Sequence, residues 1–501
     1  MSELKEFKLG FDYIAKTFAG LEHVLSKELT EIGADDVEVI KRGAKFRGDT
    51  TILYKSNYLL RTAIRILKPI GVFEVKDDQQ LYEKVRKINW MDVFNLDQTF
   101  NINAHVFNSA LEHTQFVALK AKDAIVDQFR EASGKRPWVA REDADIYIDV
   151  HISDDVCTIS LDSSGGSLHK RGYRIDADKA PINEVLAAGM IKITGWSGDK
   201  DFYDPMCGSG TIPIEAAMNA MNIPAGYYRE KFAFMNWEGF DAELWDKIKR
   251  EANDNIKEID CSIYASDRSK KAIDIAKRNL KNAALHKDIN ISAKYFDAIN
   301  PEENTGILVF NPPYGNRLEE RNEIRNLYQG IGDVLKQNFT GFEAWVITAN
   351  MDEAKFIGLR TSARIELYNG PLESRFLKFE LYEGSNKEKK NTRRGEREDN
   401  WKRERKDTTR KFDNSEERRP FRRSEKPKWK DTDNKGSYRK RDERRPDNKS
   451  ERPKWKDADD KGSFRKRDDD NFRKPGLGKP EKTEYTGDGK KGSRKKRPRL
   501  K

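Results

Sequence analysis

The segment 386–501 constrains the folding of this chain most, because it contains almost no aliphatic side chains. It has no Val, Ile, Met or Cys, and its only aliphatic residues are Ala458, Leu477 and Leu500. It carries 45 Lys and Arg against 25 Asp and Glu, a net charge of +20. Such a segment cannot bury enough apolar surface to offset the conformational entropy of folding. We therefore expect 386–501 to be a disordered basic tail.

The tail also repeats itself with a period of 26 residues, since Ser424–Asp431 recurs as Ser450–Asp457 with one Lys replaced by Arg. The units lack apolar residues that could stack, so they predict a low-complexity array rather than a solenoid. Aromatic residues lie among the cations, where bases can stack on rings while phosphates meet Lys and Arg. These are Trp429, Tyr438, Trp455 and Phe464. A nucleic-acid partner is favoured over a purely solubilising role.

Residues 1–385 differ from the tail in both composition and charge. They hold 51 Lys and Arg and 60 Asp and Glu, a net charge of −9, and their ordinary apolar content allows a substantial core. An acidic body with a basic tail indicates a polyanionic partner.

The cysteines Cys157, Cys207 and Cys261 lack the spacing of metal ligands and do not suggest a disulfide framework. The N-terminus has no secretory apolar region, and no apolar run has the length of a membrane span. We therefore expect a cytoplasmic protein without a membrane partner or a metal site.

The N-terminal part has a mixed α+β pattern. Residues 1–50 predict two strands with one helix between them, and 51–162 continue with an amphipathic helix over Gln115–Arg130. Ile146–Val150 and Val156–Leu161 alternate around Ser153-Asp-Asp155, which predicts a hairpin. Asp162–Gly166 has the composition of a linker.

From Lys179 onward helices alternate with apolar strands, which predicts βαβ units and a parallel sheet. The helices are expected at Pro181–Thr194, Ile212–Met221, Ser269–Asn282 and Glu323–Gln337. The strands are expected at Asp201–Asp204, Cys261–Ala265, Ile307–Phe310 and Glu343–Ile347. A helical insert is expected over Asn219–Glu258.

A glycine loop, Asp204-Pro-Met-Cys-Gly-Ser-Gly-Thr211, lies between a predicted strand and a predicted helix. Gly208 and Gly210 allow the backbone to approach a ligand, and the helix N-terminus offers free N–H groups to an anion. Asp204 can pair with an ammonium group. By itself, such a loop is as often a tight turn as a cofactor site.

Two further acids end the next candidate strands. Asp267 follows Ile263-Tyr-Ala-Ser, the place where doubly wound sheets bind ribose hydroxyls, although an Asp there also caps helices. Asp297 could accept a hydrogen bond from an adenine amine, but by itself it is more typical of a turn.

The most specific motif is Asn311-Pro-Pro-Tyr314, directly after the apolar strand. The two prolines end the strand and restrict the backbone. The amide oxygen of Asn311 and the carbonyl of Pro312 can then hold both hydrogens of a planar exocyclic amine, and Tyr314 can stack on the base. A rigid turn is the structural alternative, and we favour a functional role.

These two motifs together resemble those of class I S-adenosylmethionine-dependent N-methyltransferases. More narrowly, residues 8–382 resemble the THUMP-containing bacterial 23S rRNA guanine-N2-methyltransferases. The matching segments include Ala19-Gly-Leu-Glu22, Gln115–Asp123, Leu168–Arg174 and Ala180–Glu184.

The resemblance implies a ferredoxin-like subdomain at 1–50, a THUMP RNA-binding domain at 51–162 and a Rossmann-like α/β methyltransferase domain at 163–385, followed by the tail. It implies S-adenosyl-L-methionine as cofactor and RNA, specifically 23S rRNA, as partner. The implied cofactor residues are Asp204, Gly208, Gly210, Asp267 and Asp297. The implied base-binding residues are Asn311, Pro312 and Tyr314.

The segment that joins THUMP to the catalytic domain contains Lys170, Arg171 and Arg174. We expect these cations to contact RNA or to close the cofactor site, and a linker role is nearly as plausible.

The expected reaction is direct methyl transfer to an unpaired or flipped-out base. Two alternatives stay open. One is a DNA adenine-N6 methyltransferase, because the Asn-Pro-Pro-Tyr motif does not distinguish guanine N2 from adenine N6. The other is a non-catalytic RNA-binding or ribosome-assembly factor, against which the intact glycine loop argues.

Overall fold

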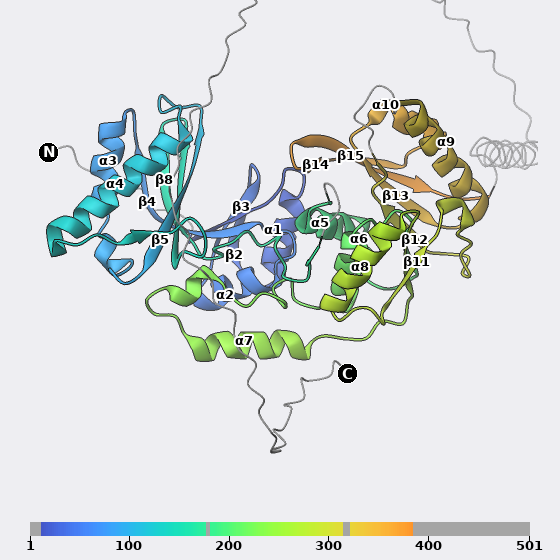
Figure 1. Ribbon diagram of the computed structural model, residues 1–501, viewed down its shortest axis with the longest axis horizontal. Coiled ribbons are helices and arrows are strands. Elements are labelled where there is room, and N and C mark those ends of the chain that lie inside the picture. The colour runs from blue at the N-terminus through green and yellow to red at the C-terminus, as the bar shows by residue number, and fades with distance from the viewer. Residues whose placement is uncertain (1–11, 177–180, 314–320, 384–501) are drawn as a thin grey trace, which may run out of the picture. The chain divides into compact units, whose positions relative to one another are not determined.

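The computed structural model describes residues 12–176, 181–313 and 321–383. The basic tail and Tyr314 therefore lie outside the described residues. The described strands form one sheet of eight strands and one of seven (Figure 1). No helix in these ranges is both long enough and apolar enough to cross a membrane.

The first sheet has the strand order β2-β3-β1-β4-β8-β7-β5-β6. Its N-terminal elements are β1 (Tyr13–Lys16), α1 (Glu22–Glu31), β2 (Asp35–Ile40), β3 (Gly43–Arg47), α2 (Thr50–Leu59) and β4 (Arg65–Glu74). Three strands thus lie within 12–50, so the expectation of two was wrong. The additional strand is β3. Its only buried apolar side chains are Ala44 and Phe46, next to the half-buried Lys45 and the exposed Arg47, so its apolar pattern is weak.

The remaining elements of this sheet are α3 (Asp78–Arg86), β5 (Thr99–Phe107), α4 (Thr114–Ser133), β6 (Trp138–Val139), β7 (Ile146–Ser153) and β8 (Val156–Asp162). Helices α3 and α4 pack together on one side of the sheet. The expected hairpin is confirmed, because β7 and β8 pair antiparallel and Asp154 and Asp155 turn the chain at φ 52° and 60°. The amphipathic helix is confirmed as α4, which buries Val117 and Ile125.

The segment Asp162–Gly166 is not a loose linker. Asp162, Ser163 and Ser164 are at most 1% exposed. The Ser163 hydroxyl donates to the carbonyl of Ile66 at 2.8 Å, and the Ser164 hydroxyl donates to Asn57 at 2.7 Å. These buried bonds fasten the segment to β4 and α2, a contact that the polar composition did not reveal.

The second sheet has the order β11-β10-β9-β12-β13-β15-β14, with β9 to β13 parallel and the last two strands antiparallel. Its strands are β9 (Phe202–Asp204), β10 (Ile263–Asp267), β11 (Ile289–Ala293), β12 (Ile307–Phe310), β13 (Glu343–Thr348), β14 (Ala363–Asn369) and β15 (Leu372–Glu380). Its helices are α5 (Glu184–Thr194), α6 (Thr211–Ala220), α8 (Lys270–Asn282), α9 (Arg321–Asn338) and α10 (Met351–Ala354). Helix α7 (Ala242–Asp254) instead packs against α2 of the N-terminal module. The predicted parallel α/β architecture is confirmed.

Side chains of β12 alternate between the two faces of this sheet. Ile307 and Val309 join the core formed with α5, α6 and α8, whereas Leu308 and Phe310 join the core formed with α9. Helix α5 begins at Glu184 rather than at Pro181, because the Asn183 side chain caps it through the backbone N–H of Val185. The insert 219–258 is only partly helical, since α7 occupies its second half.

Candidate functional site

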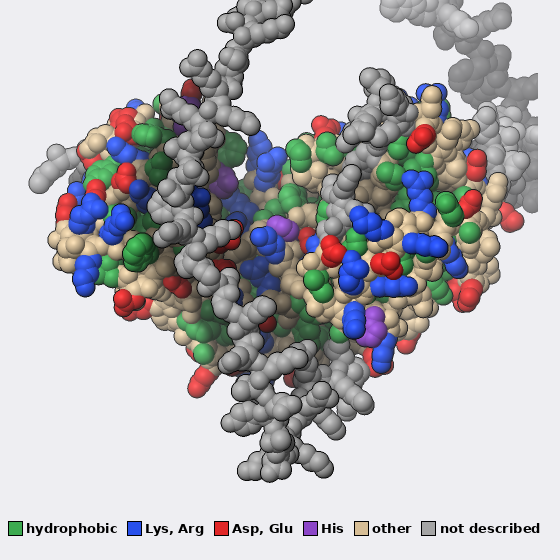
Figure 2. Space-filling view, viewed as in Figure 1, with side chains coloured by type: hydrophobic (Ala, Val, Ile, Leu, Met, Phe, Trp, Pro, Cys, Tyr) green, Lys and Arg blue, Asp and Glu red, His purple; other side chains and the backbone are tan. Residues whose placement is uncertain are grey.

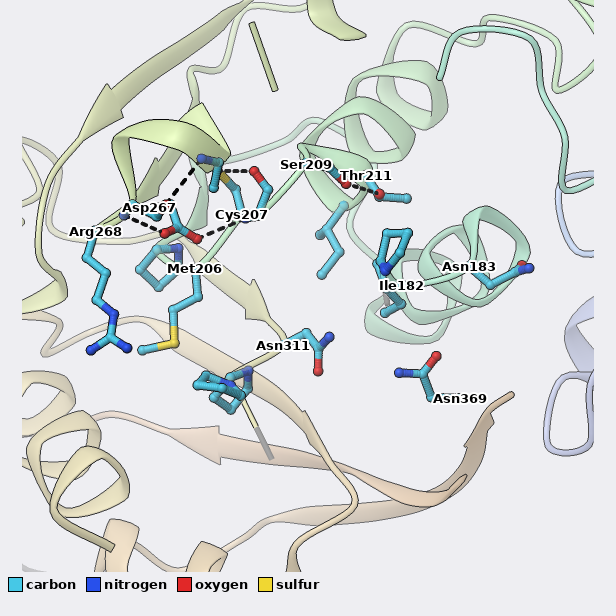
Figure 3. A pocket seen from close by; sticks show the side chains of 18 of the residues that line it. Ile182, Asn183, Met206, Cys207, Ser209, Thr211, Asp267, Arg268, Asn311 and Asn369 are labelled. Atoms are coloured by element: carbon cyan, nitrogen blue, oxygen red, sulfur yellow. Dashed lines mark hydrogen bonds between the residues drawn. The ribbon is translucent and has the colours of Figure 1, made fainter. Parts of the chain in front are cut away.

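A cavity of about 970 Å³ opens at the carboxyl ends of β9, β10 and β12 (Figure 3). Open α/β sheets bind their ligands at this edge. The cavity brings together Gly208, Asp267, Asn311 and Pro312, which the sequence places in three separate segments. Each follows or ends a strand, so the parallel sheet alone is sufficient to gather them.

The glycine loop turns the chain from β9 into α6. Gly208 and Gly210 have φ of +53° and +84°, in the left-handed region that disfavours side chains. A Cβ on Gly208 would meet no atom within 4 Å, so this glycine faces the open cavity. A Cβ on Gly210 would instead lie 3.2 Å from the Ala276 side chain of α8, and Gly210 does not line the cavity. The first glycine leaves room for a ligand, and the second allows close helix packing.

The Asp267 carboxylate ties this loop to the end of β10. One oxygen accepts the backbone N–H of Gly208 at 3.1 Å, and the other accepts that of Ser269 at 2.8 Å. Ser269, not Asp267, caps α8. Each carboxylate oxygen retains lone-pair capacity, so Asp267 could also accept hydrogen bonds from ribose hydroxyls.

Asp204 is buried directly behind the loop, with an exposed fraction of 1%. One of its oxygens accepts the Met206 backbone N–H at 3.1 Å, while Oδ2 has no partner among the described residues. Burial, followed by repulsion from Asp267, raises the pKa of the Asp204 carboxyl well above its ordinary value. Asp204 lines a smaller cavity of about 310 Å³ rather than the main one.

Asn311 lies immediately after β12, and its side chain points into the main cavity. Its amide oxygen is buried and has no hydrogen-bond partner among the described residues. A buried acceptor without a partner is uncommon and costs free energy, so it marks a place where a ligand N–H would fit. Pro312 is buried beside it.

The cavity therefore fits a nucleoside-containing ligand with an amine next to it. The open side of Gly208 and the Asp267 carboxylate could hold the ribose and the adjoining chain of such a ligand. The orphaned oxygen of Asn311 could hold the amine. Among the described residues, no cluster of His, Cys, Asp and Glu could hold a metal ion.

The expectation for Asp297 is not supported by its position. Asp297 is exposed in a short 3-10 turn and does not line the cavity, whereas its neighbours Lys294, Tyr295 and Phe296 do. The turn directs the aspartate outward and the preceding residues inward. The position of this segment after a strand end correctly indicated that it lies near the cavity, but the side chains that line the cavity are those of its neighbours.

The cations between THUMP and the catalytic domain have different environments. Arg171 is 2% exposed and pairs with the fully buried Glu215 at 3.3 Å, so it is not an RNA contact in this structure. Arg174 pairs with Glu184 at 2.7 Å and donates to the hydroxyls of Ser209 and Thr211. It therefore fastens the glycine loop to α5. Lys170 alone is exposed.

Sequence reasoning missed several residues that line the cavity. These are Phe18, Ile182, Asn183 and the turn Asn369-Gly-Pro-Leu372. The turn joins the two antiparallel strands β14 and β15, and its composition is typical of any hairpin. Phe18 comes from a segment far away in sequence, so no local pattern could have placed it here.

Three family models match consecutive parts of the chain. The RlmL ferredoxin-like domain matches residues 12–67, the THUMP domain matches 75–162, and the RMKL-like methyltransferase domain matches 171–378. Together they span nearly all of the described residues.

The chain is also similar in sequence to several bacterial proteins. A Synechocystis protein named as an RNA methyltransferase is 39% identical over 371 residues, which cover 74% of this chain and 97% of the relative. The ribosomal RNA large subunit methyltransferase K/L of Syntrophotalea carbinolica is 38% identical over 74% of this chain but only 54% of its own length. This chain thus spans about half the length of the K/L relatives.

The crystal structure of SMU.472 in complex with SAH is 29% identical, with a TM-score of 0.68 over 75% of this chain and 99% of that one. The fold, the cavity at the strand ends and the sequence identity over most of the described residues all point to the same family. The chain belongs to the family of RMKL-like methyltransferases that carry a THUMP domain.

Proposed function

We propose that this protein methylates the exocyclic amine of an RNA base, specifically N2 of a guanine in 23S rRNA. S-adenosyl-L-methionine is the cofactor, and when bound it supplies a methyl group already activated by the sulfonium charge. The observation that carries the proposal is the orphaned, buried oxygen of Asn311, which shares one cavity with Gly208 and Asp267.

The residues of the chain act mainly by positioning. The Asn311 oxygen and the Pro312 carbonyl would each accept one hydrogen of the amine, which directs its nitrogen lone pair out of the base plane. Holding two reactants in a reactive geometry can supply most of the rate enhancement when no strong base is needed. An amine within a helix is inaccessible, so the base must be unpaired or flipped into the cavity.

An RNA substrate is supported by the THUMP match and by a basic surface. Helix α8, which begins beside the cavity, exposes a row of cations (Figure 2). These are Lys270, Lys271, Lys277, Arg278 and Lys281. Asp274 is the acidic residue of the helix, and Asp176 pairs with Arg278 at 2.5 Å. Phosphates bind such surfaces without regard to sequence, so this face would hold the strand while the cavity selects the base.

Nucleoside mass spectrometry of 23S rRNA from a deletion strain tests the proposal. We expect the amount of N2-methylguanosine to fall, to return with the intact gene and to remain low with Asn311→Ala. Genomic DNA from the same strains provides the contrast, since loss of N6-methyladenine there would establish the DNA alternative instead. If no modified nucleoside changes in either polymer, the non-catalytic alternative is favoured.

A further inference from the structure

Phe18 belongs to the ferredoxin-like module yet lines the cavity of the methyltransferase domain. It lies between β1 and α1, and its half-buried ring packs against the core built from α5, α6 and the second sheet. Phe18 is not among the site residues that the sequence predicts.

The position of Phe18 is determined by its neighbours on both sides. Gly20 has φ +91°, and a Cβ there would lie 2.3 Å from the carbonyl oxygen of Glu366 on β14. Leu21 is fully buried against Gly189 of α5, where a Cβ would come within 2.5 Å of its side chain. The Thr17 hydroxyl donates to the carbonyl of Thr62 at 2.6 Å. The segment 17–21 is therefore clamped between the module and the catalytic domain.

The position of Gly20 indicates that Phe18 lies in the half of the cavity around Asn311, which we call the substrate half. β10, which carries Asp267, lies on one side of β9, while β12, β13, β15 and β14 lie on the other. Gly20 touches β14, so the segment approaches the cavity from the side of Asn311. The turn between β14 and β15 lines the same side through Asn369 and Leu372.

We propose that the ring of Phe18 stacks on the target base while Asn311 holds its amine, an inference that rests on the proposed methylation of RNA. Base–aromatic stacking depends little on which base is present, so Phe18 would provide affinity and orientation, and Asn311 would engage the amine. The ferredoxin-like module would then complete the catalytic cavity in addition to carrying RNA toward it.

The test compares Phe18→Ala, Phe18→Leu and Phe18→Tyr in the full chain. Steady-state methylation of a 23S rRNA transcript gives kcat/KM. Calorimetry with S-adenosylhomocysteine separately measures the affinity of the cofactor site. We expect Ala and Leu to lower kcat/KM by about 10- to 100-fold, the loss of one stacked base, and Tyr to stay within a few-fold of wild type. Val39→Ala, an exposed apolar position on β2 of the same module, is the matched control.

The outcomes separate this inference from the proposed function. Equal activity of the Leu and Tyr variants would overturn stacking, because Leu retains apolar packing but offers no ring. A weakened affinity for S-adenosylhomocysteine in all three variants would overturn the placement of Phe18 in the substrate half. If wild type itself does not methylate the transcript, the proposed function fails and the role of Phe18 fails with it.

Discussion

The carboxylate of Asp267 accepts the backbone N–H of Gly208 at 3.1 Å, across 59 residues of sequence. This bond joins the end of the second parallel strand to the loop that follows the first. A residue expected to bind ribose thus also determines the shape of the glycine loop, so its loss affects the cofactor site in two ways.

Asp267→Asn should therefore weaken binding of S-adenosylmethionine nearly as much as Asp267→Ala. An amide retains one acceptor oxygen, whereas the carboxylate bonds the N–H groups of Gly208 and Ser269 with two. Loss of a hydrogen bond to a charged group costs about 1.5–3 kcal/mol, or about 10- to 100-fold in affinity. Calorimetry on the folded variants measures this. Asp297→Ala, at an exposed position outside the cavity, should leave affinity unchanged.

Asn311→Ala should reduce methyl transfer by about two orders of magnitude or more, because the amine loses an acceptor that orients it. Its effect on cofactor affinity should be small, since Asn311 has no bond to the glycine loop among the described residues. Single-turnover rates with saturating cofactor measure the first effect, and calorimetry measures the second. Near-normal methyl transfer by this variant would show that Asn311 does not orient the amine.

Asp204→Asn should stabilise the ligand-free protein at neutral pH. Burial raises the pKa of this carboxyl in the folded state, while in the unfolded chain it ionises near its ordinary value of about 4. As pH rises from about 4 toward the folded pKa, the unfolded state loses the proton first, and wild type loses stability relative to the variant. Thermal unfolding at about pH 5 and pH 7.5 should show a larger advantage of the variant at the higher pH.

The same variant tests whether Asp204 pairs with the ammonium group of the cofactor. If it does, Asp204→Asn should bind S-adenosylmethionine more weakly despite its higher stability. Unchanged affinity would mean that the carboxylate, which lines the smaller cavity, does not touch the ligand.

Arg174→Met should destabilise the protein and loosen the glycine loop. It would leave Glu184, whose side chain is 6% exposed, without its ion pair. It would also remove the hydrogen bonds that the guanidinium donates to the hydroxyls of Ser209 and Thr211. An unsatisfied buried group costs about 1–3 kcal/mol of unfolding free energy. The double variant Arg174→Met with Glu184→Gln should recover part of the stability but not the cofactor affinity. Urea unfolding and calorimetry separate the two effects.

Truncation after Gly384 should leave a folded protein that still binds cofactor and methylates the same nucleotide. The removed segment 385–501 carries a net charge of +20, so RNA affinity should fall at low salt. Fewer released counterions should also make the slope of log affinity against log salt shallower. An unchanged slope would show that the tail does not bind RNA and instead increases solubility or binds a protein.

Local patterns predicted the parallel core of the catalytic domain but not the antiparallel hairpin of β14 and β15. The apolar run Ile307–Phe310 followed by two prolines predicted both a buried strand and its end. In a parallel sheet all such ends meet at one edge, so Asp267 and Asn311 could be expected in one cavity. By contrast, β3 escaped prediction because it buries only two apolar side chains, Ala44 and Phe46.

The sequence by itself determined the alternating parallel α/β pattern of the catalytic domain, the family and the polar residues that follow the strands, because these depend on short-range periodicity and on residue types. Only the tertiary structure decided which side chains face the cavity. It buried Arg171 against Glu215, turned Asp297 outward and brought Phe18 into the cavity that the turn at Asn369 also lines. Those outcomes depend on contacts between segments far apart in the chain, where desolvation and close packing decide each side chain's environment and leave no local signature.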